Sequence, residues 1–139
     1  MSKVEAVLTS VIGQPTLIYA SGLAAIYAVL LLERPDVIAH SSIYHGALET
    51  IKLYQRIRGQ GQVQVITLED DYPKVDGGKL LVWLETPVNP TGESLSIQDF
   101  ADKAHAAGGK LFVDATFGPP PLQDPFKWGA DLVMSSATK

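Results

Sequence analysis

Two kinds of hydrophobic pattern alternate along this chain. Short apolar runs are typical of buried strands, and apolar positions that recur every three or four residues are typical of amphipathic helices. The first kind predicts strands at residues 16–20, 36–40, 62–68, 80–85, 110–113 and 131–135. The second predicts helices from Val4 to about Gly13, over 23–32, from about Tyr44 to Arg58, and after Ser96. This alternation predicts an α/β fold, with a mostly parallel sheet and helices on both faces.

Local signals mark the ends of several elements. Gly13 follows the first predicted helix, and Ser96 with Asp99 three residues later resembles a capping box at the start of the last one. The segment 23–32 is apolar all round, which predicts a helix buried on most of its sides. A polar stretch that includes Gly77-Gly78 predicts a turn-rich connection between two strands.

Composition narrows the class of protein. The 139 residues, 46% hydrophobic and 19% charged, are enough for one compact folded domain. Fifteen acidic residues oppose eleven basic ones without a basic stripe, so we expect no nucleic-acid partner. The absence of cysteine excludes disulfides, thiolate catalysis and cysteine-based metal sites, and no metal site is predicted. The longest apolar run, 23–32, is too short to span a bilayer and lacks a basic leader, so we expect a cytoplasmic protein with no membrane partner.

The richest chemistry lies at the carboxyl ends of two predicted strands. Asp114 follows one apolar strand, and Ser136, Thr138 and Lys139 follow another. In open α/β sheets, ligands bind in the crevice outside these strand ends. An amine that can form a Schiff base, a carboxylate that can hold a pyridinium nitrogen protonated and hydroxyls that can bind phosphate together suit pyridoxal phosphate, PLP. The simpler interpretations are that Lys139 is a solvated lysine and that Asp114 caps a helix, although the prolines that follow Asp114 leave little helix to cap.

Three other segments fall at predicted strand ends. Ser21-Gly22-Leu23 begins a helix, where backbone N–H groups can bind phosphate, or where Ser21 is an ordinary N-cap. Tyr44 begins the next helix and could stack on a planar cofactor, although a single aromatic residue is more often part of the core. Asn89 lies between two prolines, in a rigid loop that suits either a contact with a ligand oxygen or a simple turn.

Five short motifs carry a resemblance to a known family. They are Ala20-Ser21-Gly22-Leu23, Ser41-Ser42-Ile43-Tyr44-His45-Gly46, Glu85-Thr86-Pro87-Val88-Asn89-Pro90, Val113-Asp114-Ala115-Thr116-Phe117 and Ser136-Ala137-Thr138-Lys139. The chain resembles the PLP-dependent enzymes of transsulfuration and Cys/Met metabolism, which include cystathionine γ-synthase, the cystathionine lyases and methionine γ-lyase. Leu23, His45 and Ala115 depart from the usual Met, Gly and Asn. Of these, His45 bears on substrate preference more than on cofactor binding.

The resemblance implies roles around the cofactor ring. Lys139 forms the Schiff base and later moves protons, and Asp114 pairs with the ring nitrogen. Thr116 packs against the ring, Tyr44 stacks on the opposite face and acts as an acid or base, and Asn89 lies near the ring hydroxyl. The phosphate is held by the backbone amides of Gly22 and Leu23 and by the hydroxyls of Ser136 and Thr138.

The resemblance also implies that residues 1–139 are a partial large domain of fold type I. In the family, an N-terminal arm and a small C-terminal domain flank this region, and full-length members form homo-oligomers. The expected activity is elimination or replacement at Cβ or Cγ of cystathionine-type or homoserine-type amino acids. Two alternatives stay open, an aminotransferase-like enzyme and an inactive remnant that only binds cofactor. We also expect exposed apolar surface, and therefore association or poor solubility.

Overall fold

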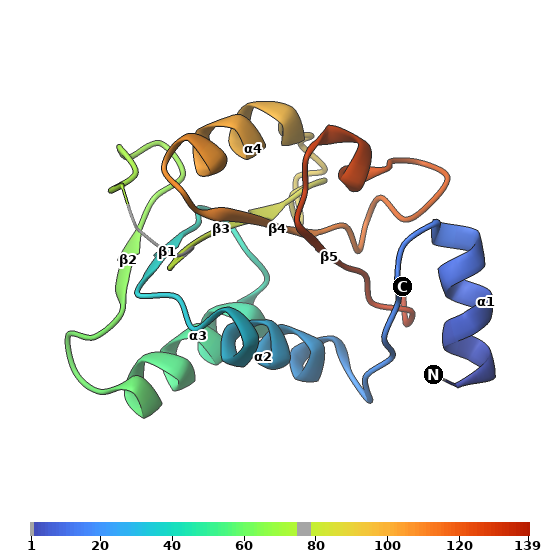
Figure 1. The fold of residues 1–139 in the computed structure, drawn as a ribbon, viewed down its shortest axis with the longest axis horizontal. Helices are drawn as coiled ribbons and strands as arrows, with labels where there is room; N and C mark the ends of the chain where they lie inside the picture. Colours follow the sequence, from blue (N-terminus) through green and yellow to red (C-terminus); the bar gives the residue numbers. More distant parts are fainter. Residues whose placement is uncertain (1, 75–78) are drawn as a thin grey trace.

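The computed structural model describes residues 2–74 and 79–139, in which a single five-stranded sheet forms the centre (Figure 1). The strands are β1 (Val37–Ala39), β2 (Gln64–Ile66), β3 (Leu80–Glu85), β4 (Lys110–Asp114) and β5 (Leu132–Met134). Their order in the sheet is β2-β1-β3-β4-β5, and every neighbouring pair is parallel. The predicted parallel α/β fold is therefore confirmed. Gly77-Gly78, part of the predicted turn, lies outside the described residues.

Helices cover both faces of the sheet, as the sequence predicts (Figure 1). The α-helices are α1 (Lys3–Ile12), α2 (Gly22–Glu33), α3 (His45–Arg58) and α4 (Ile97–Ala106), and a short 3-10 helix, η1, spans Pro125–Trp128. α2 and α3 pack on one face, whereas α4 packs on the other. None of the helices in the described residues is both long and apolar enough to cross a membrane.

The alternation of side chains along the central strand β3 divides the core into two layers. Leu80, Val82 and Leu84 face α4, while Leu81 and Trp83 face α2 and α3. All six residues of β3 are buried, because helices cover it on both sides. A fully buried side chain of this size stabilises the fold by about 1.5–3 kcal/mol, so β3 is a main anchor of the domain.

The segment 16–20 is not a strand, and the prediction of one is wrong. It connects α1 to α2 along the surface, and its backbone binds side chains of α1 instead of a neighbouring strand. The N–H of Thr16 donates to Oγ1 of Thr9 at 3.1 Å, and the N–H of Ile18 donates to Oε1 of Glu5 at 3.1 Å. A strand needs a partner in a sheet, and this segment has none among the described residues.

Two helices differ from the sequence-based expectation. In α2 only Ile26 and Leu30 are buried, whereas Leu32 is 70% exposed, so the prediction of a helix buried on most sides is wrong. The sheet covers one face of α2, and no described element covers the opposite face. At α4, Oγ of Ser96 accepts a hydrogen bond from the N–H of Asp99 at 3.3 Å, but the N–H of Ser96 donates no described return bond to the Asp99 carboxylate, so the capping box is incomplete.

The reciprocal capping box lies at α1 instead. Oγ of Ser2 accepts from the N–H of Glu5, and the Glu5 carboxylate accepts from the N–H of Ser2. α1 buries none of its residues and lies at one end of the molecule, away from the helices that cover the sheet (Figure 1).

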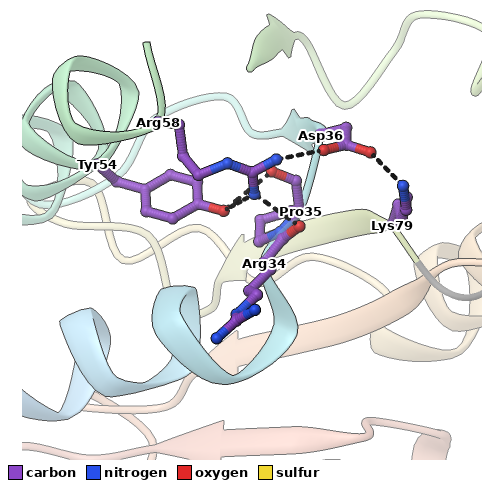
Figure 2. Close-up of polar contacts among 6 residues, drawn as sticks. All are labelled: Arg34, Pro35, Asp36, Tyr54, Arg58 and Lys79. Carbon is purple, nitrogen blue, oxygen red and sulfur yellow. Dashed lines mark hydrogen bonds and ion pairs between the residues drawn. The ribbon is translucent and has the colours of Figure 1, made fainter. Parts of the chain in front are cut away.

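A cluster of polar side chains lies at the amino ends of β1 and β3 (Figure 2). Arg58, from the last turn of α3, donates to the carbonyl of Arg34, the hydroxyl of Tyr54 and the carboxylate of Asp36, at 3.1, 2.7 and 2.8 Å. The other Asp36 oxygen lies 3.3 Å from Nζ of Lys79. One guanidinium therefore ties the end of α3 to the α2–β1 connection. This cluster is structural, because it lies at the edge of the sheet opposite the carboxyl ends of the strands.

Candidate functional site

Two buried carboxylates lie side by side at the carboxyl ends of the central strands. Glu85 ends β3, Asp114 ends β4, and the two residues are paired in register. Only 4% of Glu85 and 5% of Asp114 is exposed. Two positions earlier on the same strands, Trp83 and Phe112 stack edge to face with ring centroids 4.9 Å apart. These rings form an apolar layer next to the two acids.

Asp114 is held by Thr116 and keeps one oxygen available. The N–H and the hydroxyl of Thr116 both donate to Oδ1 of Asp114, at 3.0 and 2.6 Å. No donor from the described residues binds Oδ2. Burial raises the pKa of Asp114, although the two hydrogen bonds from Thr116 act against this rise. The available oxygen of this buried carboxylate suits a cationic N–H donor, which would compensate its charge.

Thr116 also connects Asp114 to the segment that follows β5. Oγ1 of Thr116 accepts from the N–H of Ser136 at 3.1 Å. The hydroxyls of Ser136 and Thr138 lie 3.0 Å apart, and Nζ of Lys139 lies 3.5 Å from Oγ1 of Thr138. A chain of polar contacts therefore runs from the buried acid to the exposed amine. The structure brings five of the nine candidate residues into one network.

The beginning of α2 lies beside this network. Ser21 is the N-cap, and its hydroxyl accepts from the N–H of Ala24 at 3.1 Å. The N–H groups of Gly22 and Leu23 precede the first intrahelical bonds and make no hydrogen bond in the described structure. A Cβ added at Gly22 would lie 3.8 Å from Cβ of Ser136. The start of α2 therefore lies against Ser136.

Tyr44 joins the site through its neighbours on α2 and α3. It is the N-cap of α3, and its side chain is half exposed. A Cβ added at Gly46 would lie only 2.6 Å from Cε1 of Tyr44 and 3.0 Å from Cδ2 of Leu23. The Tyr44 ring therefore packs over Gly46, next to Leu23 at the start of α2. A larger residue at position 46 would collide with the ring.

Glu85 is the functional candidate that the sequence interpretation missed. Oε2 of Glu85 accepts from the N–H of Tyr44 at 2.6 Å, and Oε1 accepts from the N–H of Asn89 at 3.1 Å. Burial raises the pKa of Glu85, the N–H of Tyr44 lowers it, and the charge of Asp114 raises it again. The sequence did contain a signal for Glu85, because this residue follows a fully apolar run just as Asp114 does. Among the described residues, Asn89 is bound to the site through its backbone N–H and not through its side chain.

The donors and acceptors at this site fit PLP. The site offers an exposed primary amine, an acceptor oxygen on a buried carboxylate, free backbone N–H groups and two hydroxyls. No group of three or more residues with metal-binding side chains occurs in the part of the chain that the structure describes.

Comparisons with known proteins agree with this chemistry. The family model for Cys/Met metabolism PLP-dependent enzymes matches residues 2–139. The chain is 36% identical to cystathionine gamma-lyase of Dictyostelium discoideum over 128 residues, which are 87% of this chain and 32% of that protein. It is 37% identical to cystathionine beta-lyase MetC of Staphylococcus haemolyticus, over 91% of this chain and 34% of that protein. The chain thus spans about a third of the length of these curated relatives.

Solved structures show the same fold. The cystathionine gamma synthase of Xanthomonas oryzae pv. oryzae, in complex with aminoacrylate and cysteine, matches with a TM-score of 0.76 and 27% identity. The match covers 98% of this chain and 37% of that one. The parallel sheet and its helices are therefore those of a fold-type-I PLP enzyme.

Proposed function

Because the chain belongs to the Cys/Met metabolism PLP-dependent enzyme family, we propose that residues 1–139 are the cofactor-binding part of its large domain. The proposed activity is elimination or replacement at Cβ or Cγ of sulfur-containing or homoserine-type amino acids. The observation that carries the proposal is the network that joins Asp114 through Thr116 to Ser136, Thr138 and Lys139. When bound, PLP supplies an electron sink next to the substrate Cα, which this class of reaction requires.

The side chains around the ring have distinct proposed tasks. Asp114 holds the proton on the ring nitrogen through the oxygen that Thr116 leaves free. Lys139 attaches the cofactor through Nζ and moves a proton at the substrate Cα. Tyr44 stacks on the ring and serves as a second acid or base, and Asn89 binds the ring hydroxyl.

The phosphate has its own set of proposed donors. They are the N–H groups of Gly22 and Leu23 and the hydroxyls of Ser136 and Thr138. The positive end of the α2 dipole favours an anion at this place. Nζ of Lys139, the proposed attachment point, lies 3.5 Å from one of these donors, Oγ1 of Thr138.

The first test is covalent attachment. The protein is incubated with PLP, reduced with borohydride and digested, and the phosphopyridoxyl adduct is located by mass spectrometry. We expect the adduct on Lys139 and its loss in Lys139→Ala. Lys3→Ala is the matched control, since Lys3 is an exposed lysine without a side-chain partner in the described structure. An adduct that is absent, or spread evenly over surface lysines, contradicts the proposal.

The second test identifies the reaction. Cystathionine, methionine and an O-acylhomoserine are offered to the PLP-loaded protein, and the products are separated by mass. Release of the sulfur group as a thiol, or of the whole acyloxy group as a carboxylate, supports the proposed activity. A keto acid that retains its side chain indicates an aminotransferase instead, and attachment without turnover indicates a remnant that only binds cofactor.

Assembly and location are part of the same proposal. We propose that the protein forms homo-oligomers, since the apolar side of α1 is exposed at Val4, Val7 and Val11 and that of α2 at Leu31 and Leu32. Cytoplasmic location is proposed as well. Sedimentation velocity tests the first point, and a monomer over a wide range of concentrations contradicts it.

A further inference from the structure

Glu85 is a buried carboxylate to which the roles proposed above assign no task. Its two oxygens each accept one backbone hydrogen bond, from Tyr44 at 2.6 Å and from Asn89 at 3.1 Å. No lysine, arginine or histidine of the described residues forms an ion pair with it. Burial of an ionised carboxylate is unfavourable unless hydrogen-bond donors compensate its charge. The two N–H groups supply this compensation for Glu85.

The two donors belong to segments that are far apart in the chain. Tyr44 ends the β1–α3 connection, 41 residues before Glu85, while Asn89 lies in the loop directly after β3. Each segment supplies a side chain that is proposed to meet the cofactor ring. Glu85 itself is fixed, because it is the last residue of a buried strand and pairs in register with Asp114. One rigid side chain therefore sets the positions of two loops relative to the acid that meets the ring.

This contact lies at the start of α3. Tyr44 is its N-cap, yet its side chain makes no capping hydrogen bond. The usual N-cap residues supply a side-chain oxygen at this point, which tyrosine does not. The carboxylate of Glu85 accepts from the N–H of Tyr44 itself, at the helix end where the dipole favours negative charge.

We propose that Glu85 is a positioning residue that holds Tyr44 and Asn89 in place at the PLP ring before the cofactor arrives. The inference rests on the proposed function for its consequence, but the contact itself exists without the cofactor. A neutral amide cannot replace the carboxylate. Glutamine offers one acceptor oxygen and one NH₂ group, so one of the two backbone N–H groups would face another donor.

Amide hydrogen exchange, followed by NMR in the cofactor-free protein, tests this directly. In Glu85→Gln, exchange at the Tyr44 or Asn89 amide, or at both, should rise by at least about tenfold, the effect of losing a hydrogen bond to a charged group. Amides in the middle of β3 and β4 should keep their wild-type rates. Glu93→Gln is the matched control, because Glu93 is exposed in the same loop and its side chain makes no described hydrogen bond.

PLP affinity is the second measurement. The dissociation constant should rise by about tenfold in Glu85→Gln and stay unchanged in Glu93→Gln. Unchanged exchange at both amides overturns the inference, as does faster exchange throughout the strands, which would indicate a merely structural residue. If Glu85→Gln does not fold, Glu85→Asp is measured in the same way, since it keeps the charge but is too short to reach both amides. A wild-type protein that takes up no PLP contradicts the proposed function, whereas the exchange data still decide whether Glu85 holds the two segments.

Discussion

Replacement of Thr116 by valine removes the link between the buried acid and the lysine-bearing segment while keeping the shape of the side chain. The hydroxyl of Thr116 donates to Asp114 at 2.6 Å and accepts from the N–H of Ser136 at 3.1 Å. The backbone N–H of Thr116 still donates to Asp114 at 3.0 Å in the variant. Thr116→Val therefore deletes two hydrogen bonds and leaves one.

The expected loss of stability follows from these contacts. A hydrogen bond to a charged group contributes about 1.5–3 kcal/mol and a neutral one about 0.5–1.5 kcal/mol. Ser136 is only half-buried, so water can replace part of what its N–H loses. Together these effects predict that Thr116→Val lowers the free energy of unfolding by about 2–3 kcal/mol.

Urea unfolding at neutral pH measures this change through tryptophan fluorescence, because Trp83 is fully buried in the folded state. With a slope of about 1–3 kcal/mol/M, the midpoint should fall by about 1 M or more. Thr116→Ser keeps the hydroxyl and should recover most of the loss. The reasoning is refuted if the valine variant unfolds like wild type, or if the serine variant is as unstable as the valine variant.

The remaining predictions concern charge and packing. Burial raises the pKa of Asp114 in the folded protein above the unfolded pKa of 3.8. The resulting contribution to stability is complete below pH 3.8 and is lost as pH rises through the folded pKa. Asp114→Asn should remove this loss, so that the free energy of unfolding depends less on pH. Arg58→Ala should lower the free energy of unfolding in urea by about 1.5–3 kcal/mol, because the guanidinium donates three hydrogen bonds that alanine cannot make. Replacement of the more exposed Lys79 by alanine should lower it by less than about 1 kcal/mol. Gly109→Ala places a Cβ 2.8 Å from Cγ of Leu80 and should cost about 1–3 kcal/mol, with a favourable coupling energy to Leu80→Ala in a double-mutant cycle.

The fold could largely be predicted because its signals are local. The apolar run 80–85 becomes a strand buried on both faces, and the helical pattern after Ser96 becomes α4. The segment 16–20 shows the limit of such patterns. Its composition is that of a strand, but strand formation requires a neighbouring strand, and here the nearest partners are side chains of α1. Whether a segment finds a neighbouring strand depends on the fold of the whole chain, so it cannot be predicted from a short window of sequence.

The candidate site divides in the same way. The sequence alone determined the residue types of the site and their position after apolar strands, because hydrophobic periodicity shows where each strand ends. Only the tertiary structure decided that Glu85 and Asp114 lie side by side and that one of them binds Tyr44 from 41 residues away. It also decided that one face of α2 remains open to solvent. Strand order and the directions of side chains across the sheet bring these groups together, and neither can be read from sequence spacing.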